Sequence, residues 1–353
     1  MTNKPDDIDP FFVLLDEKKP KTITYSKSFF YLLTRNLPSD YTAKPIVKND
    51  SLVVPYTIIK KAKIAKEASV REIVLLASER PDRNTTIRST LDLWGLSSYV
   101  DYLYTTGELG FLEGLVPMFE GGFLSPAEIK KMSEILAFLK ILIPSSELAY
   151  YQKKYGADYA QKYREIRLKM LEWSGKLQIP VIAGIIIGSD GLNDTFKKTI
   201  ETIYNAQQRY KNAHSLSIQS EILLQNGQPD PQSDENMLKA LAYIQSMKMD
   251  AMISIPTIHM HCVDHFIDAG IRDFGSIPIN PQVLFPKAAS VDFDALAAAV
   301  AKRGFTLHQR LPIKYDAIRN GIYSKKLGQV FDSYRYKIKK YEQEHVKDIK
   351  LSL

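Results

Sequence analysis

The stretch IPVIAGIIIGSDG, which runs from Ile179 to Gly191, decides the fold that we expect for this chain. Its apolar run is rich in β-branched residues, which is typical of a strand buried in a parallel sheet with helices packed over it. Gly184, Gly188 and Gly191 would let the backbone turn sharply or approach a ligand at the carboxyl end of that strand. A helical pattern follows at once. The stretch therefore predicts a strand, a tight turn and a helix. The pattern fits both a turn that binds a ligand and a turn that only connects the strand to the helix.

Strand and helix patterns alternate on both sides of this stretch. The strand patterns are ITYSKSFFYLLTR (23–35), REIVLLASER (71–80), LVPMF (115–119), FLKILI (138–143), SLSIQSEILL (215–224), AMISIPTI (251–258) and DFGSIPI (273–279). Helical patterns separate them; one opens with Ser125 and Glu128 at the spacing of a capping box, and another is expected to begin at Ser233 or Asp234. Such regular alternation predicts an α/β fold, most simply a TIM-like (βα) barrel.

The two ends of the chain differ from this pattern. We expect an irregular N-terminal arm over residues 1–21, the barrel over 22–320 and a basic amphipathic C-terminal helix over 321–353. In that last segment apolar side chains recur at spacings of three and four, at Leu327, Val330, Phe331, Tyr334, Ile338 and Tyr341. Such a helix either folds back on its own barrel or docks onto a second subunit.

Composition limits the class of protein. At 353 residues and 45% hydrophobic content, the chain can bury a full core. It has no apolar run of about eighteen residues, so we expect no membrane span. The acidic start MTNKPDDIDP does not resemble a secretory signal, so we expect a cytoplasmic protein. Cys262 is the single cysteine, which excludes an internal disulfide and any metal cluster held by several cysteines of this chain.

The formal net charge of +7 is unevenly distributed, because residues 324–353 carry eight Lys or Arg against four acids. A basic stretch of this kind is more often the solvated face of a helix than a site for polyanions. No zinc-finger spacing, RNA-binding aromatic signature or Walker loop accompanies it. The sequence therefore does not favour nucleic acid as a partner.

Several short motifs follow one another between Ile23 and Asp316: ITYSKSFFYLLTR, VLLASERPD, GLSSYVDYL, GFLSPAEI, IPVIAGIIIG, FIDAGIRDFGS and GFTLHQRLPIKYD. Their order resembles the radical-SAM subunit of deazaflavin (FO) synthase, the family that makes the chromophore of coenzyme F420. The resemblance implies a barrel of radical-SAM type, in agreement with the alternation of strands and helices. It also implies a four-iron cluster held by a C-x-x-x-C-x-x-C loop, with one iron open to S-adenosylmethionine.

The chain departs from the family in the loop that would hold this cluster. Leu33, Thr34 and Arg35 are followed by NLPSDYTAKP, which contains no cysteine. Hard oxygen donors such as Asp40 and Tyr41 do not replace soft thiolates. We therefore expect no iron–sulfur cluster and no reductive cleavage of S-adenosylmethionine.

Other positions of the implied pocket have also changed. Ser78 and Glu79 replace a glycine–acid pair, and Pro144 replaces a glutamate that would face the ribose; proline has neither a carboxylate nor a backbone donor. The binding of S-adenosylmethionine itself is therefore doubtful. Our candidates for the pocket are Glu79, Arg80, Gly184, Gly188, Asp190, Gln219, Glu221 and His259.

Three of the six histidines fall within the segment IHMHCVDH. Alternate residues of an extended segment share a face, and so do residues four apart on a helix, so His259, His261 and His265 are candidate ligands for zinc or a similar metal. The alternative is that they make structural or pocket hydrogen bonds.

Three functions are compatible with these observations. The first is a pseudoenzyme: a barrel without the cluster that serves as a scaffold, a regulatory subunit or a carrier of a small molecule, in association with an active relative or with itself. The second is an enzyme with non-radical, metal-assisted chemistry in the old pocket. The third is nucleic-acid binding by the basic tail.

Overall fold

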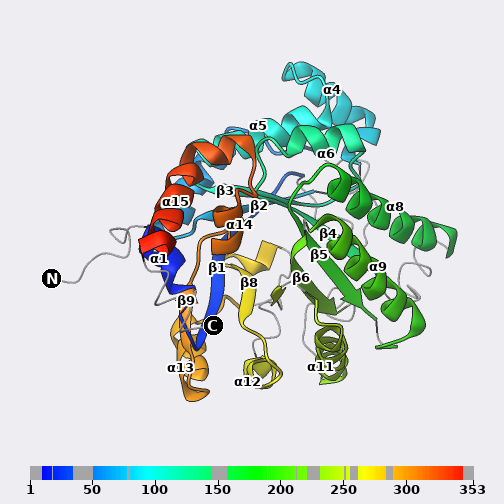
Figure 1. Cartoon of the computed structure of the whole chain (residues 1–353). Helices are drawn as coiled ribbons and strands as arrows, with labels where there is room; N and C mark the ends of the chain where they lie inside the picture. The colour runs from blue at the N-terminus through cyan, green and yellow to red at the C-terminus, as the bar shows by residue number, and fades with distance from the viewer. Residues whose placement is uncertain are drawn as a thin grey trace.

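A computed structural model of the chain describes residues 10–17, 19–34, 51–77, 80–144, 157–188, 190–211, 213–220, 231–249, 252–254, 261–283 and 289–344. Strands and helices alternate along this part of the chain (Figure 1). The strands are β1 (Thr22–Leu32), β2 (Glu72–Leu76), β3 (Val116–Glu120), β4 (Phe138–Pro144), β5 (Val181–Ile187), β6 (Ala213–Ser220), β7 (Met252–Ser254), β8 (Asp273–Pro278) and β9 (Thr306–Gln309). The α-helices are α1 (Pro10–Asp16), α3 (Thr57–Glu67), α4 (Thr85–Leu93), α5 (Tyr99–Leu112), α6 (Pro126–Met132), α8 (Ala157–Lys176), α9 (Asp194–Tyr210), α11 (Pro231–Ser246), α12 (Val263–Asp268), α13 (Phe293–Lys302), α14 (Tyr315–Asn320) and α15 (Lys325–Glu344).

The parallel strands form a ring. From β2 to β8 they are paired in chain order, and β1 joins the two ends by pairing with both β8 and β2. The first half of β1 also pairs with β9. Within the described residues, β7 and β8 are joined only at Ser254 and Asp273. The expected TIM-like α/β fold is confirmed.

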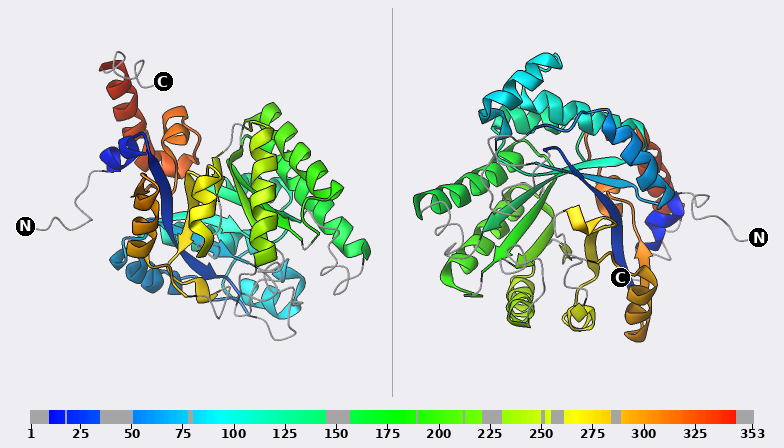
Figure 2. Two further views of the ribbon diagram at one scale, coloured as in Figure 1. Left: turned by 90° about the horizontal axis from the view of Figure 1, so that it is seen from below. Right: turned by 180° about the vertical axis from the view of Figure 1, so that it is seen from behind.

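Side chains of the strands alternate between an outer and an inner layer. On β2, Ile73 and Leu75 belong to the outer apolar cluster beneath the helices, whereas Val74 and Leu76 belong to a second cluster on the opposite face. The two further views show the helices arranged around the outside of the strands (Figure 2). Around the inside, register aligns Leu142, Gly184, Ser217, Ser254 and Asp273 in one row.

The C-terminal helices cover the end of the lumen at which the strands begin. Leu327, Phe331 and Ile338 of α15 are buried in the inner cluster together with residues of β2 to β5. Between these helices and the strands lies a buried charge network, in which the Asp273 carboxylate pairs with Arg310 Nε at 3.0 Å and Lys314 Nζ at 2.9 Å. The amphipathic helix therefore packs on its own barrel.

The structure differs from the expected elements at two places. Residues 10–16, expected to be irregular, form α1, whose Leu14 is fully buried in the inner cluster; so short a helix has little periodicity to reveal it. Helix α11 begins at Pro231 rather than at Ser233 or Asp234, because proline is tolerated at the first position of a helix. By contrast, the capping box of Ser125 and Glu128 is confirmed.

Among the described residues, no helix combines the length with the apolar character that crossing a membrane requires.

Candidate functional site at the carboxyl ends of the strands

The glycine-rich turn after β5 is accounted for mainly by packing. A Cβ atom on Gly184 would lie 2.3 Å from Leu142 Cδ2, so a larger residue there would displace the Leu142 side chain on the neighbouring strand. Gly191 has a φ of +64°, which favours glycine, and its amide donates to the carbonyl of Gly188. Asp190 is exposed and accepts a hydrogen bond from the Asn193 side chain, which itself caps α9. These contacts support the interpretation of the turn without a ligand.

Other predicted residues are placed only in part. Backbone register aligns Pro144, Ile186 and Gln219 across β4, β5 and β6, so the backbone of Gln219 lies near the carboxyl end of β6. Glu79, Glu221 and His259 lie outside the described residues.

Arg80 follows β2 and lines a pocket beside the loop after β3. Its guanidinium donates from Nη1 to both carboxylate oxygens of Glu128, at 2.8 and 2.9 Å, and from Nη2 to Asp82. The pocket has a volume of about 490 Å³ and is lined by Arg80, Asp82, Arg83, Arg88, Phe123, Ser125 and Glu128.

The chemistry of this pocket is set by ionised groups. Burial by itself would raise the pKa of Glu128, but the backbone amide of Ser125 and the Arg80 guanidinium outweigh it and lower that pKa. Arg83 and Arg88 are exposed. The pocket therefore offers arginines beside fixed carboxylates, a setting that suits a small polar or anionic ligand.

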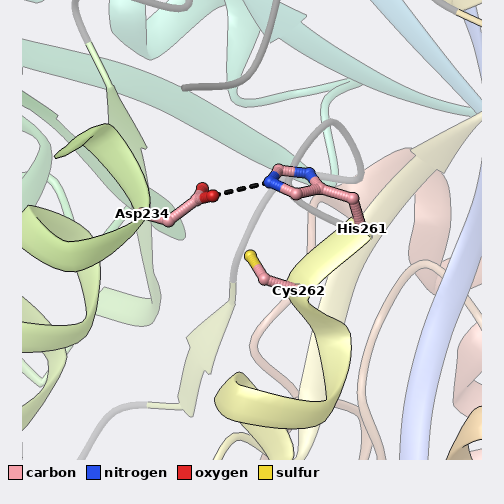
Figure 3. Close-up of side chains that lie close together, drawn as sticks. All are labelled: Asp234, His261 and Cys262. Carbon is pink, nitrogen blue, oxygen red and sulfur yellow. Dashed lines mark hydrogen bonds and ion pairs between the residues drawn. The ribbon is translucent and has the colours of Figure 1, made fainter. Parts of the chain in front are cut away.

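A second group of side chains lies after β6 and β7, separated from the first by β4 and β5 in the ring. The Asp234 carboxylate, in the first turn of α11, accepts a hydrogen bond of 2.6 Å from His261 Nε2. Cys262 lies beside both side chains (Figure 3). The ligand atoms of these three residues all lie within 4.8 Å of one another. The carboxylate thus comes from the first turn of α11, and the imidazole and the thiol come from the two residues before α12.

The thiol of this group is protonated when no metal is bound. Burial, and after it the neighbouring Asp234 carboxylate, raise the pKa of Cys262 to about 12. A thiol of this kind is a poor nucleophile at neutral pH. The carboxylate, imidazole and thiol are nonetheless donor types that a divalent cation binds, in which case the thiol gives up its proton.

The sequence offered His261 with His265, or His259 with His261, as metal-binding pairs, and both pairs stay predictions. Helix α12 begins at Val263, so His261 precedes the helix. His265 is exposed and does not belong to the group of three. The structure instead pairs His261 with Asp234, which the sequence had singled out only as a possible helix start. Asp234 lies in the first turn of α11, the helix that follows β6, and β6 is the neighbour of β7 in the ring. This position is the signal that could have identified Asp234 as a partner of His261.

Buried charged side chains also escaped sequence reasoning. Glu120 at the end of β3 is 2% exposed and pairs with Lys140 of β4 at 2.9 Å. Arg167 of α8 is buried and donates to the carbonyl of Gly121 and to Tyr163 Oη. No local pattern marks such residues, because charged side chains normally occupy the surface.

Comparison with known proteins gives one consistent group of relatives. The chain is 26% identical over 303 residues to the 7,8-didemethyl-8-hydroxy-5-deazariboflavin synthase of Methanococcus aeolicus, covering 83% of this chain and 84% of the relative. It is 27% identical over 336 residues to the synthase of the same name from Archaeoglobus fulgidus, covering 89% and 97%. No protein-family model matches.

Among solved structures, the fold is similar to that of HydG, a maturase of the FeFe hydrogenase. The TM-score is 0.62 at 10% identity, and the match covers 92% of this chain and 72% of HydG. At this level of identity the similarity concerns the fold alone.

Proposed function

We propose, on the premise that this chain is homologous to the deazaflavin synthases over most of its length, that it is a cluster-free member of that lineage without radical chemistry. It would act in the cytoplasm as a scaffold, a regulatory subunit or a carrier of a small polar molecule, in association with an active relative or with a second copy of itself. A connection with coenzyme F420 metabolism would follow from the resemblance to the family that makes the chromophore of that coenzyme.

The main support for this proposal is that the chain has too few cysteines to hold the cluster. The radical-SAM cluster implied by the resemblance needs three cysteine ligands in the loop after the first strand, and this chain contains one cysteine. That residue, Cys262, lies after β7, and β8 separates β7 from β1 in the ring. The donor set therefore does not fit a four-iron cluster.

The pocket beside Arg80 supports a carrier or regulatory role. It lies at the carboxyl ends of the barrel strands, where barrel proteins bind their ligands, and it keeps ionised groups in fixed positions. Pro144, at the end of β4, brings no side-chain donor or acceptor to the same edge. Ligand contacts would thus come from the loops after β2 and β3.

Reconstitution tests the loss of radical chemistry. The purified protein is incubated anaerobically with iron and sulfide, analysed for both elements, and then assayed with a reductant for cleavage of S-adenosylmethionine. The synthase from Archaeoglobus fulgidus, treated in parallel, is the positive control. We expect no stoichiometric cluster and no cleavage; a four-iron cluster that supports cleavage would refute the proposal.

Calorimetry then distinguishes a carrier from a scaffold. Saturable binding of S-adenosylmethionine by the iron-free protein, weakened by Arg80→Ala, would support a carrier that has kept the ancestral ligand. The absence of heat would exclude that ligand and leave the scaffold and regulatory roles, which co-elution with an active synthase on a sizing column would support.

A further inference from the structure

We propose that Asp234, His261 and Cys262 form a binding site for one zinc-class divalent cation, with a coordination position left open to solvent. This site goes beyond the proposed function and does not depend on it, since it lies on another part of the ring and uses none of the residues of the Arg80 pocket.

The kinds of ligand point to zinc. One carboxylate, one imidazole and one thiolate form a borderline-soft set that suits Zn²⁺, and hard cations such as Mg²⁺ or Ca²⁺ would leave the sulfur unused. The two anionic ligands, once the thiol has lost its proton, neutralise the charge of a divalent ion. The sequence alone had pointed to histidines only, whereas the structure contributes three different ligand types.

The geometry requires only a small adjustment. Ligand atoms about 2.0–2.3 Å from a tetrahedral zinc are separated from one another by roughly 3.3–3.8 Å. Asp234 Oδ2 and His261 Nε2 are 2.6 Å apart, and all three ligand atoms lie within 4.8 Å. The His261 side chain is 43% exposed and can move outward, while Asp234 and Cys262 are held in more buried positions (Figure 3).

The position in the fold supports an open site. Asp234 lies in the first turn of the helix after β6, and His261 and Cys262 come after β7, so all three lie at the carboxyl ends of adjacent barrel strands. Among the residues that the structure describes, three protein ligands with a solvent-accessible histidine leave one tetrahedral position for water or for a ligand atom. This is the arrangement of zinc sites that bind or activate a small molecule rather than of closed structural sites.

Cobalt provides a direct test because Cys262 is the only cysteine. Tag-free protein is stripped with a chelator, dialysed and titrated with Co²⁺ while its near-ultraviolet and visible spectra are recorded. We expect one equivalent of Co²⁺ to produce a thiolate-to-cobalt band and the visible bands of four-coordinate cobalt, and Zn²⁺ to abolish both, since zinc binds such sites more tightly. Any sulfur-to-cobalt band must come from Cys262.

Matched variants assign the ligands. Cys262→Ser should remove the thiolate band, and Asp234→Asn and His261→Gln should each weaken Co²⁺ binding on the order of 100-fold or more, because loss of a direct ligand costs at least as much as loss of an outer partner. His265→Gln, an exposed histidine on the same segment, should bind as the parent does.

The test has clear negative outcomes. A folded parent protein that shows no thiolate band in excess Co²⁺ would overturn the proposal. So would Asp234→Asn and His261→Gln variants that bind as tightly as the parent while circular dichroism shows them folded. His261 is exposed, so its substitution is expected to leave the fold intact even if Cys262→Ser does not.

Discussion

At the scale of single residues, Arg80 combines backbone strain with an ion pair. Its φ of 43° and ψ of 61° lie in the left-handed region, which is unfavourable for residues other than glycine. The side chain pairs with Glu128 and Asp82. The backbone of the pocket rim is therefore held in place by charged side chains, as is common where a loop serves a site.

Two substitutions at Arg80 separate strain from pairing. Both Arg80→Ala and Arg80→Gly remove the ion pairs, but only glycine relieves the left-handed conformation. We expect Arg80→Gly to be more stable than Arg80→Ala by about 1 kcal/mol in urea unfolding. Equal stabilities would show that this conformation is not retained in solution.

At the scale of elements, α15 stabilises the barrel that it covers. Phe331 is 3% exposed and packs with Tyr323 and Tyr334, whereas Tyr336 on the same helix is 71% exposed. The helix is thus amphipathic in the manner predicted, and its apolar face is already occupied by the barrel.

Aromatic substitutions on the two faces of α15 test this assignment. Phe331→Ala should lower the free energy of unfolding by about 3–5 kcal/mol because it leaves a cavity. Tyr336→Ala, the matched control, should change it by no more than about 0.5 kcal/mol. Both are measured by urea unfolding.

A role for α15 in docking alone makes a different prediction. In that case a chain that lacks residues 324–353 would unfold at the same denaturant concentration as the parent, and Phe331→Ala would be as mild as Tyr336→Ala. We expect the shortened chain to be severely destabilised.

At the scale of the whole molecule, the barrel is closed at one end by buried charges. Glu72 is buried and accepts hydrogen bonds from Ser26 Oγ at 2.7 Å and Ser276 Oγ at 2.5 Å. Burial raises the pKa of Asp273, but Arg310 and Lys314 outweigh it and hold that pKa at about 2. Residues at this end of a barrel generally contribute to stability rather than to catalysis.

Glu17 makes the stability of this end dependent on pH. Burial raises its pKa from 4.5 to about 7, although the Tyr315 amide and Arg310 oppose the shift. Between these two values the unfolded chain loses the proton while the folded chain keeps it. The stabilisation is therefore complete below pH 4.5 and is lost as the pH rises to about 7.

Comparison with Glu17→Gln isolates this contribution. Between pH 4.5 and about 7 the unfolding midpoint of the parent should decline relative to that of Glu17→Gln. At higher pH the difference between the two midpoints should stay constant. A difference that is flat throughout would show that Glu17 titrates normally. Asp273 does not interfere, because its contribution is lost only in acid, as the pH falls towards 2.

The sequence by itself determined the alternation of strands and helices, the amphipathic tail and the supply of thiolates. The first two depend on periodicities of two and of 3.6 residues, which local sequence records, and the third is a count of cysteines. The stretch from Ile179 to Gly191 was thus enough to indicate a buried parallel strand and its turn.

Only the tertiary structure decided which side chains meet. Asp234 contacts His261 across 27 positions, and Asp273 meets Arg310 and Lys314, because the ring of strands brings successive loops to a common edge. It also decided that the Leu142 side chain packs closely against Gly184, and that Leu14 belongs to the core. Contacts of this kind depend on closure of the barrel, and no local pattern encodes them.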